Sequence, residues 1–158
     1  MTKEPWLTSM LATNFETADI ESQGSRISVR RRRPAGQVAQ SVLLLHGFLA
    51  QNRWWDAVAS LLPDTWDVVS MSFAGMGSSD WRQEYSREAD VADVLNILDW
   101  AAFQTKPLLV GHSFGGAIGT HVMCQAGEAF ARYVVIDTPI RLEPQPAGAA
   151  WSTLRKFY

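Results

Sequence analysis

The sequence predicts an α/β fold in which a mostly parallel sheet is flanked by helices. Short apolar runs recur along the chain, over residues 41–48, 66–73, 107–113 and 131–137. Segments whose apolar residues follow a helical spacing separate these runs. Continuous apolar runs are typical of strands buried on both faces, and alternation of strands with helices calls for crossover connections between parallel strands.

A β-hairpin is predicted before the first of these strands. Residues 15–34 read FETADIESQGSRISVRRRRP, in which two stretches of rough alternation flank the turn SQGS. Four consecutive arginines, Arg30 to Arg33, close the second stretch. They could form a nucleic-acid patch, but the acidic net charge of −2 favours a solvated strand end.

Three helices are predicted between and after the strands. Residues 52–63 show helical spacing and stop at a proline, and residues 114–130 read as a helix despite their glycines. Residues 86–103 open with Ser-x-x-Ala and predict a long amphipathic helix. The apolar positions are Trp54, Trp55, Val58, Leu61 and Leu62 in the first helix, and Val91, Val94, Leu95, Leu98 and Ala102 in the long one.

One serine lies between two glycines where the strand over 107–113 meets the next helix. The motif runs Gly111-His112-Ser113-Phe114-Gly115 and matches G-x-S-x-G, a pattern that chance produces in about one chain of this length in twenty. An abrupt strand-to-helix turn strains its apex residue, and the glycines allow the flanking backbone to pass closely. The apex hydroxyl would project at a helix N-terminus, where the N–H of Phe114 can stabilise an oxyanion. The alternative is a serine that merely caps the helix.

A second oxyanion donor is expected from the loop after an earlier strand, and His46-Gly47-Phe48 supplies such a loop. With both features in place, the sequence resembles the α/β-hydrolase superfamily, in its branch with a serine nucleophile similar to esterases and lipases. The resemblance covers residues 10 to 158 and rests on LLLHGF (43–48), WWDAVASLL (54–62), MSFAGMGSSDW (71–81), VGHSFGG (110–116) and VVIDTP (134–139).

The resemblance implies a role for each matching residue. Ser113 would be the nucleophile, and the amides of Phe48 and Phe114 would form the oxyanion hole. Trp54 would line an apolar acyl pocket, with plain core packing as its alternative. No cofactor or metal is implied. The residues expected to shape the elbow and the oxyanion loop are His46, Gly47, Gly111, His112, Gly115 and Gly116.

A base for Ser113 is not evident in the sequence. His112 adjoins the serine and should point away from it, and His121 lies two turns down the helix, roughly 12 Å off. His46 belongs to the oxyanion loop. The family's chain order is nucleophile, acid, histidine, so the usual acid and the histidine would follow later. Asp137, at the end of the last strand, is a candidate acid, with a structural role as its alternative.

We therefore expect residues 1–138 to be the N-terminal part of a hydrolase core, truncated after the sixth strand, and residues 139–158 to begin a cap. Two interpretations remain open: a fragment of an active hydrolase, itself inactive, or a degenerate hydrolase-fold protein kept for binding. If the chain is a fragment, its strand over 131–137 would be an exposed, apolar edge of the sheet, and the chain should associate.

The expected reaction is acyl transfer on an ester or similar carbonyl bond of a small, fairly apolar substrate. A serine nucleophile argues against epoxide hydrolases and haloalkane dehalogenases, whereas perhydrolases and carbon–carbon bond hydrolases remain open. The net charge of −2 predicts no nucleic-acid or membrane partner. The single Cys124 and the lack of an apolar leader predict a cytoplasmic protein. The oligomeric state is left open.

Overall fold

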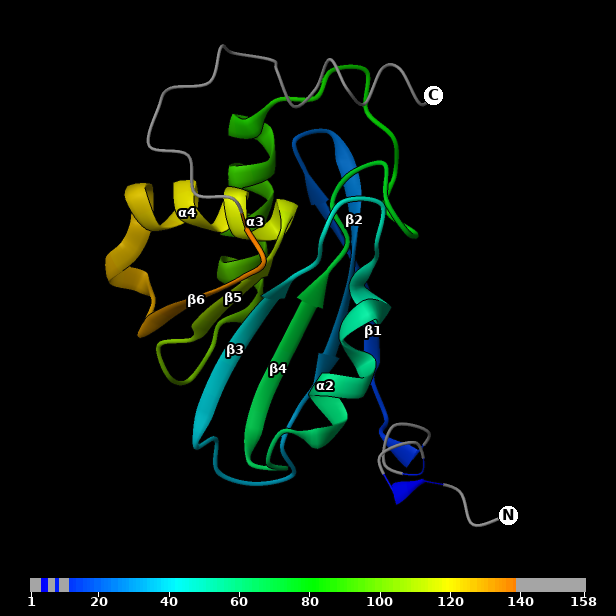
Figure 1. Ribbon diagram of the computed structural model, residues 1–158, viewed down its shortest axis with the longest axis vertical. Coiled ribbons are helices and arrows are strands. Elements are labelled where there is room, and N and C mark those ends of the chain that lie inside the picture. The colour runs from blue at the N-terminus through cyan, green and yellow to red at the C-terminus, as the bar shows by residue number, and fades with distance from the viewer. Residues whose placement is uncertain (1–3, 6–7, 9–11, 139–158) are drawn as a thin grey trace.

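The computed structural model describes residues 4–5, 8 and 12–138, and their strands form one six-stranded sheet in the order β1-β2-β4-β3-β5-β6 (Figure 1). The central strands β4, β3, β5 and β6 run parallel, and the predicted hairpin β1–β2 is antiparallel. The predicted fold class is confirmed. The strands span Glu16–Ser22 (β1), Ser25–Arg32 (β2), Gln40–Leu45 (β3), Trp66–Met71 (β4), Leu108–His112 (β5) and Arg132–Ile136 (β6).

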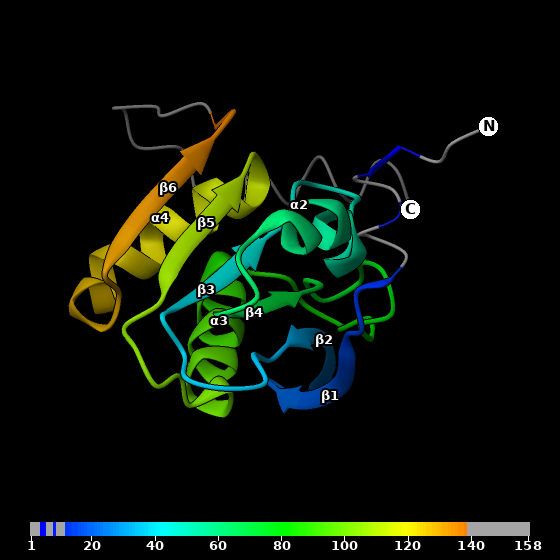
Figure 2. The same cartoon turned by 90° about the horizontal axis from the view of Figure 1, so that it is seen from below.

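Helices cover both faces of the sheet, with α2 on one face and α3 and α4 on the other (Figure 2). Alternate residues of β3 explain this layering: Leu43 and Leu45 pack with the α3 and α4 side, whereas Val42 and Leu44 pack with the α2 side. The continuous apolar run therefore serves two cores. The helical elements are η1 (Asn52–Trp55), α2 (Asp56–Leu61), α3 (Arg87–Ala101), α4 (Phe114–Ala126) and η2 (Gly127–Ala129).

The helix predicted over residues 52–63 forms as the short pair η1 and α2, but its predicted apolar face is largely wrong. Trp55 and Ala59 are buried against β3 and β4, and the partly buried Leu62 packs against the same core. The side chains that the spacing placed with them, Trp54, Val58 and Leu61, are 59%, 45% and 64% exposed.

Helix α3 also differs from its predicted face. Val91 and Val94 are buried as predicted, but Ala102 lies beyond the helix as its left-handed C-terminal cap. The buried face is rotated because it includes two aspartates, Asp90 and Asp93, which no apolar spacing can reveal.

The arginine run is not a solvated strand end. Arg31 is 3% exposed, and its guanidinium donates to both carboxylate oxygens of Asp67 at 2.9 and 2.5 Å. Arg30 pairs in the same way with Asp56, and Arg32 donates to backbone carbonyls at the end of α2. Only Arg33 is largely exposed. Strand β2 lies beside β4, so its cations meet acidic partners inside the fold.

Within the described residues, β6 pairs only with β5 and forms a sheet edge. Its Val134, Val135 and Ile136 are 43%, 36% and 41% exposed, which is the apolar edge that was expected. The expected cap residues, 139–158, lie outside the described residues. No helix in the described part of the chain is long and apolar enough to cross a bilayer.

Candidate active site

Ser113 occupies a strained turn between β5 and α4. Its backbone angles are φ 49° and ψ −111°, a conformation that costs a residue with a side chain about 1–3 kcal/mol. The end of β6 holds the turn in place: the Ser113 N–H donates to the Ile136 carbonyl at 2.9 Å, and the Thr138 hydroxyl donates to the Ser113 carbonyl at 3.1 Å. The apex geometry expected for a nucleophile elbow is therefore present.

The glycines around Ser113 are required by close backbone contacts. A Cβ on Gly111 would lie 2.6 Å from the Gly115 oxygen, and a Cβ on Gly115 would lie 2.5 Å from the Leu45 oxygen. A Cβ on Gly116 would collide with the Thr138 hydroxyl. The start of α4 thus crosses the ends of β3 and β5 at a distance that only hydrogen allows.

His46 holds the loop after β3 in shape. It is completely buried, its Nε2 accepts the Phe73 N–H at 3.1 Å, and its Nδ1 donates to the Gly47 carbonyl at 2.6 Å. Burial lowers the pKa of this imidazole to about 4. Because both ring nitrogens are engaged and the ring is neutral, His46 has no free atom with which to act as a base.

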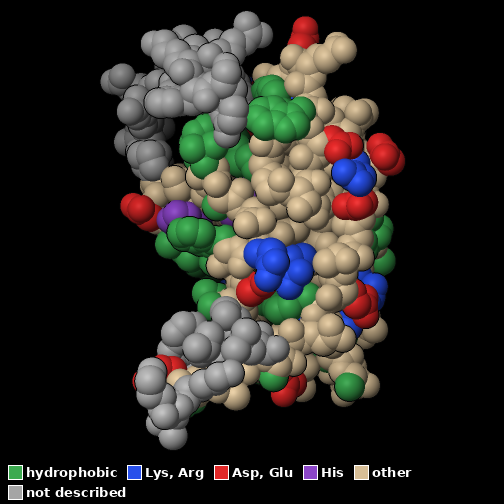
Figure 3. All heavy atoms as spheres, turned by 90° about the vertical axis from the view of Figure 1, so that its right-hand side faces the viewer, with side chains coloured by type: hydrophobic (Ala, Val, Ile, Leu, Met, Phe, Trp, Pro, Cys, Tyr) green, Lys and Arg blue, Asp and Glu red, His purple; other side chains and the backbone are tan. Residues whose placement is uncertain are grey.

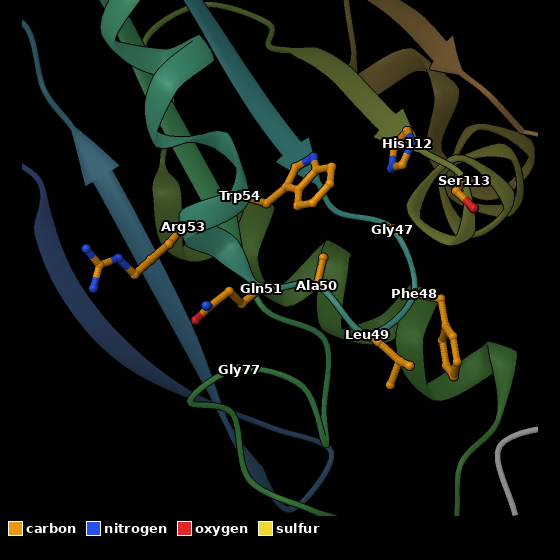
Figure 4. Close-up of a pocket in the computed structure, with 10 residues that line it drawn as sticks. All are labelled: Gly47, Phe48, Leu49, Ala50, Gln51, Arg53, Trp54, Gly77, His112 and Ser113. Atoms are coloured by element: carbon orange, nitrogen blue, oxygen red, sulfur yellow. The ribbon is translucent and has the colours of Figure 1, made fainter. Parts of the chain in front are cut away.

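An open pocket of about 710 Å³ lies in front of Ser113. The loop after β3 and the start of η1 form one wall, and the end of β5 forms the other (Figure 4). Leu49 and Trp54 are 58% and 59% exposed, so apolar side chains reach solvent at this open mouth, beside polar ones such as Arg53. The described lining consists of Gly47, Phe48, Leu49, Ala50, Gln51, Arg53, Trp54, Gly77, His112 and Ser113.

The two candidate oxyanion residues lie next to each other. Phe48 belongs to the pocket wall, and its ring lies 6.1 Å from the ring of Phe114, which in turn packs edge-on against Phe73 at 5.0 Å. Within the described residues the Phe48 N–H has no hydrogen-bond acceptor. The ring contacts of Phe114 join the loop after β3 to the first turn of α4.

His112 and Trp54 form part of the pocket wall together. Their rings are stacked at 5.9 Å with an angle of 16°, and Trp54 is 59% exposed, so it lines the pocket whereas its neighbour Trp55 packs in the core. A Cβ on Gly47 would lie 2.6 Å from His112 Nδ1, which explains the glycine there. Figure 4 shows the Ser113 hydroxyl directed away from the His112 ring.

The remaining candidates do not reach Ser113. Asp137 is exposed over 90% of its side chain, and its described contact is with His112 Nε2 at 4.0 Å. His121 lies on α4 beside Arg87 and Glu88, and burial is the main cause that lowers its pKa. Among the described residues, the Ser113 hydroxyl has no hydrogen-bond partner, and no cluster of side chains could hold a metal ion.

Several pocket residues were not predicted from the sequence. Gln51 and Arg53 follow the His-Gly-Phe loop directly, and this proximity was the available signal. Gly77 comes from the loop after β4, which Ser72 holds by accepting the Asn52 N–H at 2.9 Å. Ser72 thus joins this loop to the start of η1.

The relatives found by comparison with known proteins include a lipase, serine hydrolase-like proteins and epoxide hydrolases. Lipase LipV of Mycobacterium tuberculosis is 29% identical over 117 residues, which cover 74% of this chain and 43% of the lipase. The human serine hydrolase-like protein is 32% identical over 107 residues, covering 64% of this chain and 51% of that protein. The chain thus spans about half the length of these curated relatives, or less.

The fold likewise matches solved hydrolase structures. The thioesterase domain from the curacin biosynthetic pathway superposes with a TM-score of 0.74 at 23% identity, over 90% of this chain and 52% of that domain. The sequence profile of the alpha/beta hydrolase family matches residues 42–157, which is most of the chain. The chain is therefore a member of the alpha/beta hydrolase family.

Proposed function

We propose that this chain carries the nucleophile and the oxyanion hole of a serine hydrolase that cleaves an ester or similar carbonyl bond in a small, fairly apolar substrate. The observation that carries the proposal is the strained backbone of Ser113, at φ 49° and ψ −111°, between a parallel strand and a helix. A serine needs no such strain to cap a helix, and its side chain makes no capping hydrogen bond here.

In the proposed reaction, Ser113 Oγ attacks the substrate carbonyl carbon and the carbonyl oxygen becomes an oxyanion. The N–H groups of Phe48 and Phe114 donate to that oxyanion. The carbon–oxygen bond to the alcohol then breaks, and the alcohol leaves with the proton that came from Ser113. Attack by water on the resulting ester releases the acid and restores the serine.

Both steps need a base that none of the three histidines supplies. His46 is committed to its loop, His112 points away, and His121 makes no described contact with the serine. We propose that the base comes from outside residues 1–158, and that Asp137 is at most an accessory acid. Residues 1–158 alone should then have little activity, from the oxyanion hole and binding only.

The second candidate is a hydrolase-fold binding protein without catalysis. Among the described residues no histidine is hydrogen-bonded to the Ser113 hydroxyl, and this favours the second candidate. The two functions differ in one property, because only a hydrolase needs a serine that a base can activate.

Labelling with a fluorophosphonate, followed by peptide mass spectrometry, tests the proposal. The polypeptide as the cell makes it should take up one adduct at Ser113. Ser113→Ala should abolish the adduct, and Ser78→Ala, which changes an exposed serine in another loop, should not. Residues 1–158 alone should remain unlabelled. An unlabelled natural polypeptide would support the binding protein instead.

A further inference from the structure

Trp54 is an exposed aromatic residue on a fixed backbone. Its neighbour Trp55 is 4% exposed in the core, so η1 turns one tryptophan inward and the other outward. The Asn52 N–H donates to Ser72 Oγ at 2.9 Å, and both carboxylate oxygens of Asp56 accept from Arg30. Because both ends of η1 are tied to the sheet, little conformational freedom is lost when a ligand contacts Trp54.

The Trp54 ring also has a fixed orientation. The His112 ring lies nearly parallel to it, and the residue after His112 is Ser113. Trp54 is nevertheless 59% exposed, so part of it remains open to a ligand. The result is a flat aromatic wall beside the proposed nucleophile.

Apolar side chains lie across the pocket from this wall. Phe48 and Leu49 lie on the opposite rim of the pocket, and Figure 4 shows the guanidinium of Arg53 directed away from Ser113. In the space-filling view, hydrophobic side chains and an acidic side chain lie next to a surface histidine (Figure 3). The described lining contains no acidic side chain.

We infer that Trp54 determines specificity by stacking on a planar, unsaturated ring of the substrate, so that the preferred substrates are esters of aryl acids or aryl alcohols. This inference rests on the proposed function of the same pocket. A planar ring can meet the flat wall with its whole face, whereas a saturated ring of the same size presents only a few hydrogens. Aromatic pairs are more favourable than their buried area alone predicts, by a factor of about 2 to 10 in affinity.

Binding of benzamide and cyclohexanecarboxamide, measured by isothermal titration calorimetry, tests the inference. The two compounds share the carbonyl group, the absence of charge and the number of carbons, and they differ in planarity. The chain should bind benzamide about 2- to 10-fold more tightly. Trp54→Leu should remove this preference. The matched control is Trp81→Leu, which changes a tryptophan that is 61% exposed and outside the pocket lining, and it should keep the preference.

Equal affinities, a preference for cyclohexanecarboxamide, or a preference that survives Trp54→Leu would each overturn the inference. So would the absence of saturable binding by either compound. None of these outcomes decides whether Ser113 is a nucleophile, because fluorophosphonate labelling measures that property independently. Labelling with no aromatic preference would leave the hydrolase and remove the aryl specificity.

Discussion

Asp90→Asn should stabilise the fold near neutral pH. Asp90 lies on α3 with 1% exposure, and its Oδ2 is buried with no hydrogen-bond partner among the described residues. Burial, and then the charge of Asp93, raise its pKa to about 8, against a smaller opposing effect of Arg82. At pH 7 the folded chain therefore holds a proton on Asp90 that the unfolded chain has lost.

The pH dependence follows from this difference in bound protons. Between pH 4 and pH 8 the folded state binds more protons than the unfolded state, so the free energy of unfolding falls as pH rises and levels off above pH 8. From pH 4 to pH 7 the Asp90 contribution falls by about 4 kcal/mol, at about 1.4 kcal/mol for each pH unit. Asparagine has nearly the same shape and does not titrate, so its variant lacks this contribution.

Urea unfolding followed by circular dichroism, from pH 4 to pH 9, measures the effect. The free energy of unfolding of Asp90→Asn, relative to that of the unsubstituted chain, should rise by about 4 kcal/mol between pH 4 and pH 7. Asp99→Asn, an exposed change on the same helix, should show no such rise. A difference between Asp90→Asn and the natural chain that is constant with pH would refute the reasoning.

Two further substitutions test the packing around the site and the sheet. Gly115→Ala places a Cβ 2.5 Å from the Leu45 carbonyl oxygen and should lower the free energy of unfolding by about 2 kcal/mol or more. In the control, Gly127→Ala, the nearest contact is at 3.5 Å, and stability should change by less than about 0.5 kcal/mol. Similar melting temperatures for the two variants would contradict the close crossing of α4 over the end of β3. Arg31→Met leaves Asp67 buried without its partner, so it should lower the free energy of unfolding by about 3–5 kcal/mol at pH 7, measured by urea unfolding. A loss of stability below about 1 kcal/mol would show that the ion pair is not the reason why the arginine is buried.

The sequence was sufficient to predict the sheet and the elbow because both depend on local patterns. The apolar run of β3 serves two cores, and that double burial is visible in its lack of alternation. The glycines around Ser113 likewise mark a crossing that no side chain permits.

The contacts between distant segments could not be predicted in this way. Arg31 and Asp67 lie 36 residues apart, and only the pairing of β2 with β4 makes them partners. The stack of Trp54 on His112 similarly depends on η1 lying beside the end of β5. Apolar spacing predicted a helix at residues 52–63, but it could not tell which of two adjacent tryptophans enters the core.

The most direct test of the central claim is the mass of the natural polypeptide after treatment with a fluorophosphonate. We expect a single adduct that maps to the peptide containing Ser113 and is absent from Ser113→Ala. A polypeptide that stays unlabelled, or an adduct that persists in Ser113→Ala, would contradict the claim that Ser113 is the nucleophile of a hydrolase.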